Sequence, residues 1–344
     1  MNRKAACQTA QETRRNGDWN EISAETVIEI ATAYYYDDVT QEELAKRFGV
    51  SRVRVSRLLK RARADGVVEI RVNQQPGPSA DLEREFIQRF NIDRLLVSVD
   101  QSDVDAQRMA VAGLVANYLV KILTDGMIVA TGMGRNVAAV ATGALSPVRR
   151  AVTFVSAIGG SARAGETMNP DHIGRRLSVR FGGDSETLYA PALVANMGLR
   201  DELYQNETVK LVLDRARRAD IALIGIGDLS EDSNMVRMGW FTPQEVAEAR
   251  LSGTIGDIMG YDFIDIHGRP STTGMQGRVI GLTTRDLLRI PDVIAIASEN
   301  TKAAAIVGAL RTGAINTLAT SSTNAHTVLR LDEATKSRTS PAIS

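Results

Sequence analysis

Cysteine is almost absent from this sequence. Cys7 is the single thiol among 344 residues, so no disulfide can form within the chain, and a reducing compartment is expected. Long apolar runs are absent too: no stretch approaches the roughly 18 residues of a membrane-spanning helix, and the N-terminal stretch has no apolar signal-peptide segment. We therefore expect a cytoplasmic protein with no membrane partner.

Histidine is scarce as well. His172, His267 and His326 are widely separated and lack the spacing of metal ligands, so we expect no metal, no cofactor and no catalytic residue. Carboxylates such as Asp228 and Asp257 suit a general base, but they suit the binding of sugar hydroxyls equally well. The sequence pattern alone leaves both roles open.

A net charge is also lacking, because 41 basic residues balance 41 acidic ones. The balance is uneven along the chain: residues 46–71 hold nine basic and two acidic side chains, a net charge of +7, which leaves −7 for the rest. Such asymmetry suggests a module that binds a polyanion, attached to an acidic body. The alternative is an ordinary solvated helix face, and the residue pattern has to decide between them.

The pattern in the basic region predicts a helix, a tight turn and a further helix. Apolar residues at helical spacing predict a first helix over residues 24–36. Thr40 followed by Glu43 is a capping box, which starts a second helix. Gly49 then supplies a left-handed turn residue, and Ser51 can cap a third helix. The second and third predicted helices have the arrangement of a helix-turn-helix, in which the later of the two helices enters the major groove of DNA.

The third helix has two different faces. The inward face of the unit is expected to comprise Leu44, Ala45, Val50, Val55 and Leu58. Arginine forks on the outward face can pair with guanine edges, and serine and lysine can reach phosphates. Like charges three or four residues apart on a helix repel, so a structural role gives little reason to cluster arginines there. The predicted DNA-binding residues are Ser51, Arg52, Val53, Arg54, Ser56, Arg57 and Lys60.

Composition predicts where the domains begin and end. Val67, Val68, Ile70 and Val72 follow the turn dipeptide Asp65-Gly66 and predict a short wing. The predicted parts are a disordered tail (1–20), a winged helix-turn-helix domain (21–73), a linker with two prolines (74–79), a large C-terminal domain (80–333) and a polar tail (334–344).

The large domain alternates short apolar runs with amphipathic stretches. The runs are β-branched and do not alternate with polar residues, as expected for buried parallel strands; they span residues 95–99, 127–131, 152–157, 221–226 and 293–297. Helical patterns span residues 106–123 and 302–311. This order predicts an α/β fold with a doubly wound parallel sheet, which binds ligands at the carboxyl ends of its strands.

Three glycine-bearing loops follow predicted strands. GMGRN (132–136) precedes a helix expected near Val137, and its glycines and Arg135 suit an anion, although it lacks the spacing of a dinucleotide or triphosphate loop. IGGS (158–161) and GIGD (225–228) follow two other strands. The alternative is that GMGRN is only a tight strand-to-helix turn; the functional interpretation is that the loops converge on one pocket.

Together these features resemble the SorC family of bacterial transcriptional regulators, in which a helix-turn-helix precedes a sugar-binding domain. The resemblance extends from the first helix to near Leu329, and it covers TQEELAKRFGVSRVRVSRLLKRARADGVVEI (40–70), GMGRN, IGG, LYAPALV (188–194), GIGD, GDIMGYDFID (256–265) and the stretch 279–321. It implies a Rossmann-like body, similar to sugar-phosphate isomerases and deaminases, that forms an effector-binding and oligomerisation domain. It also implies operator DNA, a phosphorylated sugar or polyol, and a second copy of the chain as partners in a dimer or tetramer.

The resemblance also assigns effector-binding residues. Lys302 matches a lysine near the phosphate, and Asp257 matches an acidic position that binds hydroxyls, with Asp228 ending the GIGD loop. The expected cradle comprises Gly132, Gly134, Arg135 and Asn136 on one loop and Gly159, Gly160 and Ser161 on the next. Asn136 and Tyr261 depart from the residues that many members have at these positions.

These observations favour a DNA-binding regulator that responds to a ligand and controls a carbohydrate or polyol catabolic operon. We expect this regulator not to be an enzyme. An isomerase- or deaminase-like enzyme with a DNA-binding domain is the alternative, and it predicts turnover of a phosphosugar. An architectural DNA-binding protein without a ligand is a third hypothesis, and it leaves the three glycine loops unexplained.

Overall fold

The computed structural model divides into two compact units, Met1–Gln75 and Pro76–Ser344. It describes residues 23–35, 37, 39–68, 79–143, 145–146, 148–230, 233–259, 262–271 and 277–339. The predicted N-terminal tail with Cys7, most of the predicted wing and linker, and Tyr261 lie outside the described residues.

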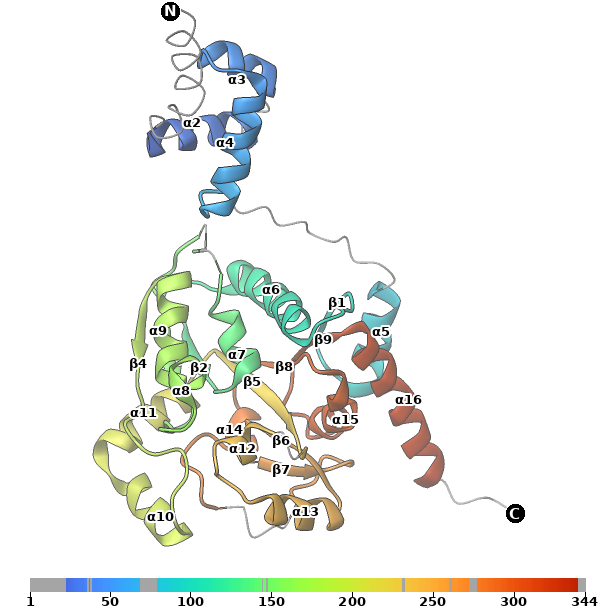
Figure 1. Ribbon diagram of the computed structural model, residues 1–344. Coiled ribbons are helices and arrows are strands. Elements are labelled where there is room, and N and C mark those ends of the chain that lie inside the picture. Colours follow the sequence, from blue (N-terminus) through green and yellow to red (C-terminus); the bar gives the residue numbers. More distant parts are fainter. Residues whose placement is uncertain are drawn as a thin grey trace, which may run out of the picture. The chain divides into compact units, whose positions relative to one another are not determined.

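The described residues of the first unit form the three helices that the sequence predicts: α2 (Ala24–Tyr35), α3 (Gln41–Arg47) and α4 (Arg52–Ala64) (Figure 1). Thr40 and Glu43 form the predicted capping box, in which the Glu43 amide donates to Thr40 Oγ1 and the Thr40 amide donates to the Glu43 carboxylate. Gly49 has a φ of 64°, which is the left-handed conformation expected after α3. Leu44 and Val55 are fully buried where the helices cross.

The second unit contains a seven-stranded parallel sheet in the order β1-β9-β8-β5-β2-β3-β4. An antiparallel hairpin of β6 and β7 extends from the end of β5. The strands are β1 (Arg94–Ser98), β2 (Ile128–Thr131), β3 (Thr153–Ser156), β4 (Asp184–Glu186), β5 (Ile221–Asp228), β6 (Thr254–Ile258), β7 (Asp262–Asp265), β8 (Asp292–Ala297) and β9 (Thr317–Ser321).

Helices cover both faces of this sheet. They are α5 (Ser79–Phe90), α6 (Val104–Ile122), α7 (Arg135–Val140), α8 (Gly165–Met168), α9 (Pro170–Phe181), α10 (Met197–Gln205), α11 (Glu207–Arg217), α12 (Asn234–Arg237), α13 (Pro243–Leu251), α14 (Thr284–Leu287), α15 (Ala303–Arg311) and α16 (Ser322–Thr339), with a 3₁₀ turn, η1 (Asn300–Lys302). One apolar core lies between the sheet and α6, α7 and α9. The other lies between the opposite face and α5, α11, α15 and α16. The doubly wound parallel sheet predicted from the sequence is therefore confirmed.

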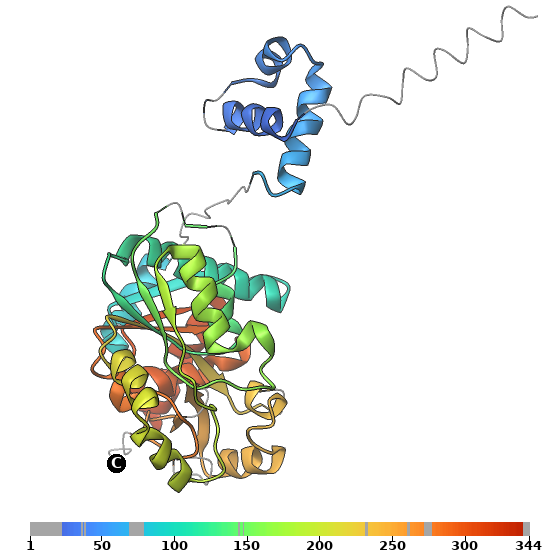
Figure 2. The same ribbon diagram turned by 90° about the vertical axis from the view of Figure 1, so that its left-hand side faces the viewer.

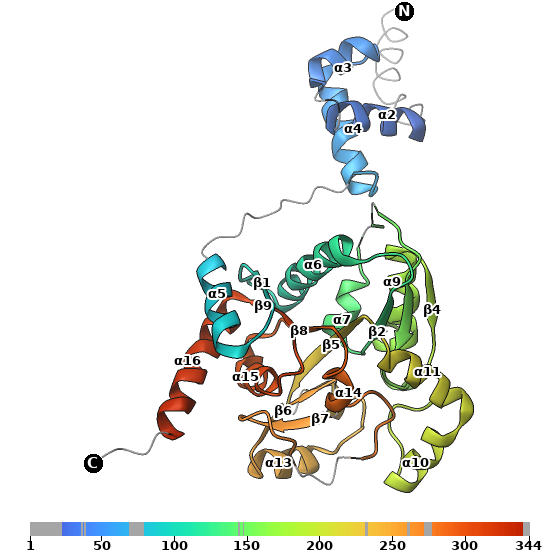
Figure 3. The same ribbon diagram turned by 180° about the vertical axis from the view of Figure 1, so that it is seen from behind.

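The two edges of the sheet are closed differently. Figure 2 views the unit from the side of β4, the strand at one edge. At the other edge, α5 and α16 lie side by side next to β1 (Figure 3). The last helix, α16, continues to Thr339 and so extends past the predicted domain end at residue 333. In the described parts of the chain, no helix is long and apolar enough to cross a bilayer.

All five predicted strands are present, but the apolar runs did not indicate β9. Its residues are TLATS, and every one of them is buried between β1 and β8. Thr320 Oγ1 donates to the Ala297 carbonyl at 2.6 Å, and Thr317 Oγ1 donates to Asp292 Oδ1 at 3.2 Å. Because these hydroxyls are satisfied inside the sheet, a central strand can contain three polar residues without the cost of unpaired groups.

Candidate functional site

The exposed face of α4 presents the predicted DNA-binding side chains. The Ser51 hydroxyl accepts a hydrogen bond from the Arg54 amide at 3.2 Å and caps the helix. Six of the predicted residues are exposed, namely Ser51, Arg52, Val53, Ser56, Arg57 and Lys60, whereas Arg54 is half-buried. Val53 is 62% exposed although it is apolar, which suits contact with a thymine methyl group.

The opposite face of α4 supplies core residues, so the orientation of the helix is set by packing. Val55, Leu59 and Ala62 are buried against α2 and α3. Two basic residues nearby form ion pairs at the surface: Arg47 of α3 contacts Glu29 at 3.2 Å, and Arg61 of α4 contacts Asp65 at 3.1 Å. The arrangement therefore presents a basic helix face in the position that a helix-turn-helix uses to read DNA.

The second unit has a pocket of about 370 Å³ at the carboxyl ends of β2, β5 and β8, which are adjacent in the sheet. The chain reaches this edge in three separate loops and in the β6–β7 hairpin. Six of the predicted effector-binding residues line the pocket: Gly134, Arg135, Asn136, Asp228, Asp257 and Lys302. A crevice at this position is where open α/β sheets bind their ligands.

The loop after β2 turns directly into a helix. Gly134 has a φ of 105°, a conformation that disfavours any side chain, and α7 begins at Arg135 rather than near Val137 as predicted. Arg135 Nε is buried and has no hydrogen-bond partner among the described residues. The guanidinium therefore has donor capacity to offer an anion in the pocket.

Asn136 ties this loop to the end of β8. Its Nδ2 donates to Glu299 Oε2 at 2.9 Å, and its Oδ1 accepts from Ser298 Oγ at 2.6 Å. Both atoms of the amide are thus engaged with the segment that follows β8. Asn136 holds two walls of the pocket together, in addition to lining it.

Glu299 and Lys302 form an ion pair in the pocket wall. Lys302 Nζ lies 2.8 Å from Glu299 Oε2, and both side chains are less than 15% exposed. Burial alone would raise the pKa of Glu299, but the Lys302 ammonium and the hydrogen bonds from Lys302 and Asn136 outweigh it and hold the pKa well below its usual range. Arg108 Nη2 adds a weaker contact to Glu299 at 3.4 Å. A buried carboxylate and a buried ammonium therefore face the same space.

Asp228 and Asp257 lie on the β5 side of the pocket. Thr301 Oγ1 donates to Asp228 Oδ2 at 2.9 Å, and Ser230 Oγ donates to Asp228 Oδ1 at 2.8 Å. Asp257 is fully buried on β6, opposite Gly227 of β5. A Cβ atom at Gly227 would collide with the Asp257 carboxylate, so glycine is required for this close approach.

We expect Gly227→Ala to reduce the free energy of unfolding by about 1–3 kcal/mol, because the added methyl group overpacks a buried carboxylate. Gly225→Ala is the matched control: it lies on the same strand, and the nearest atom to its Cβ would be the Met133 carbonyl oxygen at 3.9 Å, an ordinary contact. Urea unfolding of both variants measures the difference. Equal unfolding midpoints would contradict the close packing of Asp257 on β5.

The other predicted cradle residues do not line the pocket. Gly132 extends the sheet, since its amide donates to the Leu223 carbonyl at 2.9 Å. Gly159 and Gly160 follow β3, one strand farther out, and pack on the backbone of residues 190–191. Ser161 lies one contact away, because its Oγ accepts a hydrogen bond from Trp240 Nε1 at 3.2 Å and Trp240 lines the pocket.

Several lining residues were missed by the sequence analysis. They include Glu299, Arg237, Trp240 and five of the ten methionines: Met133, Met168, Met235, Met238 and Met259. Glu299 had a detectable signal, since it lies two residues after the end of the predicted strand 293–297. Met133 lies within the GMGRN loop, but the other four methionines and Trp240 had no signal, because single apolar residues in loops are indistinguishable from core residues until the chain is folded.

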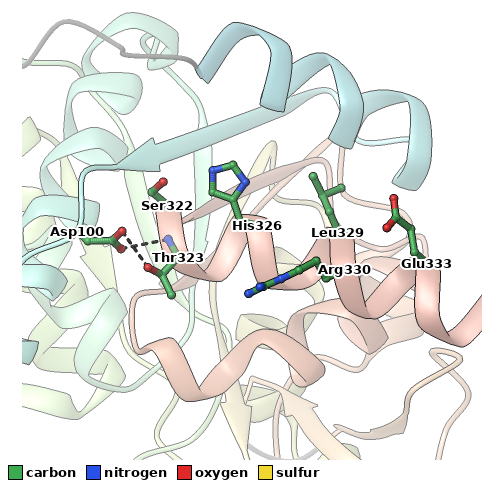
Figure 4. Close-up of a pocket in the computed structure, with 7 residues that line it drawn as sticks. All are labelled: Asp100, Ser322, Thr323, His326, Leu329, Arg330 and Glu333. Atoms are coloured by element: carbon green, nitrogen blue, oxygen red, sulfur yellow. Dashed lines mark hydrogen bonds between the residues drawn. The ribbon is translucent and has the colours of Figure 1, made fainter.

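A second hollow, of about 440 Å³, runs along α16 and holds none of the predicted residues (Figure 4). Asp100 on its wall accepts hydrogen bonds from the backbone and side chain of Thr323, so it caps the helix. His326 lines this hollow, whereas His172 lies near Asp171 on α9. Among the described residues, no cluster of histidine, cysteine and carboxylate side chains has the arrangement of a metal site.

Comparison with known proteins agrees with this architecture. Residues 74–330 match the family model described as "Putative sugar-binding domain", and residues 29–65 match region 4 of sigma-70. The chain is 30% identical over 317 residues to the transcriptional regulator LsrR of Klebsiella pneumoniae subsp. pneumoniae, covering 89% of this chain and 93% of the relative. It is 27% identical to the sorbitol operon regulator of Klebsiella pneumoniae, covering 88% and 97% of the two chains.

Solved structures show the same similarity. The full-length sorbitol operon regulator SorC from Klebsiella pneumoniae superposes with a TM-score of 0.75 at 27% identity, covering 90% of this chain and all of that one. The sugar-binding domain of a transcriptional repressor from Vibrio fischeri is 49% identical, with a TM-score of 0.69, and covers 74% of this chain and 99% of its own. These relatives are transcriptional regulators and not enzymes. The chain belongs to the SorC family of transcriptional regulators, in which a helix-turn-helix DNA-binding unit precedes a sugar-binding domain.

Proposed function

We propose that this regulator controls a carbohydrate or polyol catabolic operon and responds to a phosphorylated sugar or polyol bound in the pocket at the ends of β2, β5 and β8. The observation that carries the proposal is the convergence of cationic and carboxylate side chains from separate loops on one cavity. Cations suit a phosphate group, and carboxylates suit the hydroxyl groups of a sugar.

Arg135 and Lys302 would bind the phosphate. Arg135 offers a planar fork with a buried Nε, and Lys302 offers a compact ammonium in the lining of the same pocket. Asp228 and Asp257 would accept hydrogen bonds from hydroxyl groups. The loop of Gly159, Gly160 and Ser161 would contribute indirectly, because Ser161 accepts a hydrogen bond from the indole of Trp240, which lines the cavity.

The exposed face of α4 would read operator DNA in the major groove. The proposed contacts come from Ser51, Arg52, Val53, Arg54, Ser56, Arg57 and Lys60. In a dimer or tetramer, two such helices would bind two half-sites, and effector binding would change their spacing or orientation. Because bacterial operators are in the cytoplasm, the regulator would act there.

A thermal-shift panel tests the effector class. Sorbitol 6-phosphate, ribose 5-phosphate and fructose 6-phosphate are compared with their unphosphorylated parents and with inorganic phosphate. A ligand at 100 times its Kd stabilises the native state by about 2.7 kcal/mol, so at least one phosphorylated compound should raise Tm by several degrees. If no phosphorylated compound raises Tm, or if the parent sugars raise it equally, the effector class is wrong.

A further inference from the structure

A cluster of charged side chains joins three helices at the β1 edge of the sheet. Asp332 of α16 is 1% exposed and lies 2.7 Å from Arg311 Nη2 of α15 and 2.8 Å from Lys336 Nζ of its own helix. Arg89 of α5 lies 3.8 Å from Asp332 and 2.6 Å from Glu333. Burial would raise the pKa of Asp332, but the hydrogen bonds and charges of Lys336 and Arg311 outweigh it and keep this pKa below its usual value, so Asp332 stays ionised at neutral pH.

Arg311 connects this cluster to the pocket through α15. The helix begins directly after Lys302, which lines the pocket, and ends at Arg311. The Arg311 guanidinium also donates to the Ile266 carbonyl at 2.8 Å, next to β7. One side chain therefore joins α15, the β6–β7 hairpin and α16.

The pocket end of α15 and the hairpin are packed as one body. A Cβ atom at Gly256 of β6 would collide with Ala305, and a Cβ atom at Gly308 of α15 would collide with the Asp265 carbonyl of β7. Asp257 of β6 lines the pocket as well. A ligand that contacts both Lys302 and Asp257 would therefore contact both α15 and the β6–β7 hairpin. The far ends of these two elements meet at Arg311, and because a closely packed interior transmits small displacements, a shift at the pocket would reach Arg311.

Arg89 connects the cluster to the element that leads to the DNA-binding unit. It lies near the C-terminal end of α5, and α5 is the first described helix after the first unit. Arg89 reaches α16 through Glu333 and Asp332, and Figure 3 shows α5 and α16 side by side at this edge. Since Asp332 is buried and is shared by cations from all three helices, a shift of Arg311 weakens one of its ion pairs, and closer contact with the remaining cations offsets that cost.

We propose that the Arg311–Asp332–Glu333–Arg89 cluster couples the effector pocket to operator binding, with Arg89 as the positioning residue that passes a displacement of α15 to α5. This inference rests on the proposed function. It makes the cluster a coupling device, distinct from residues that contact either the effector or DNA, and it predicts that coupling can be lost while both affinities remain.

The test uses the full-length chain with Arg89→Gln, which removes the charge and leaves a shorter, polar side chain. Arg84→Gln is the matched control, because Arg84 lies on the same helix and its ion pair with Asp81 is exposed to solvent. Calorimetry measures the Kd of the phosphosugar from the thermal-shift panel, with and without a saturating DNA fragment from the upstream region. The ratio of the two Kd values is the coupling factor.

Wild type and Arg84→Gln are expected to show a coupling factor of about tenfold, and Arg89→Gln a factor within about twofold of one, with each separate affinity near the wild-type value. Hydrogen exchange supplies a second readout: the phosphosugar should alter exchange in residues 79–90 of the wild type but not of Arg89→Gln. If Arg89→Gln lowers Tm yet keeps the coupling factor, the cluster is merely structural and the inference is wrong. If no phosphosugar binds the wild type, the proposed effector class falls first and this inference falls with it.

Discussion

We expect Lys302→Met to remove the response at the effector concentration that suffices for the wild type, while operator affinity stays close to the wild-type value. Lys302 lines the pocket and supplies an ammonium that is only 12% exposed, so its loss removes a charge-assisted contact worth about 1.5–3 kcal/mol. The Kd for the effector should therefore rise by about tenfold to a hundredfold. Calorimetry measures this Kd, and gel-shift titration measures the operator affinity.

The same substitution also leaves Glu299 without its closest cation. Breaking a buried ion pair by removing one partner can cost about 3–5 kcal/mol, although the Asn136 contact at 2.9 Å remains and should reduce the loss here. The double variant Lys302→Met/Glu299→Gln separates the two effects, because it removes the uncompensated carboxylate. We expect it to recover stability in urea unfolding without recovering the effector response.

Arg135→Ala provides an independent check from a different element, since Arg135 begins α7 whereas Lys302 precedes α15. It should also weaken the effector response, and no buried ion pair is lost with it among the described residues. If Lys302→Met releases DNA at the effector concentration that suffices for the wild type, the assignment of Lys302 to the phosphate is wrong.

We expect Arg52→Ala and Arg57→Ala each to weaken operator binding and to leave effector affinity unchanged. Both side chains are exposed on the outer face of α4, where one good base contact is worth about 1–3 kcal/mol, or about fivefold to a hundredfold and more in Kd. Arg61→Ala is the matched control, because it removes the same charge from the same helix at a position paired with Asp65. It should weaken binding less and about equally for all DNA sequences.

The salt dependence of binding identifies the kind of contact that each arginine makes. A lost phosphate contact reduces the slope of log K against log salt by about one, whereas a lost base contact mainly relaxes the sequence preference. Gel-shift titrations at several salt concentrations measure both. Calorimetry that shows lost effector binding in Arg52→Ala or Arg57→Ala would contradict the separation of the two functions.

The helices of the first unit were predictable because their signals are local. Thr40 and Glu43 contact each other three residues apart, and Gly49 needs its left-handed conformation whatever surrounds it. The five apolar strands were predictable for a similar reason, since a run of β-branched residues is buried wherever it lies in the sheet. Strand β9 was not, because Thr317 and Thr320 find hydrogen-bond acceptors on β8, 25 and 23 residues earlier in the chain.

The candidate site was predictable only in part. The glycine-bearing loops after β2 and β5 meet in the pocket, but the IGGS loop follows β3 and lies one strand farther out. Chain order could not reveal this, because β5 returns beside β2 after the chain has formed β3 and β4. Glu299 and Lys302 come together with Asn136 for the same reason. Strand β8 lies next to β5, and the loop that follows β8 reaches the N-terminal end of α7, where Asn136 lies.

The sequence by itself determined the DNA-binding helices, the α/β class and several of the charged residues that line the pocket. Periodicity, capping and apolar runs depend on residues that are close together in the chain, so they can be recognised without the folded structure. Only the tertiary structure decided which of those side chains share a cavity and which pairs are buried together. Strand order in a parallel sheet is set by packing between residues far apart in the chain, and no local pattern encodes it. The pocket at the ends of β2, β5 and β8 and the ion cluster around Asp332 are both products of that order.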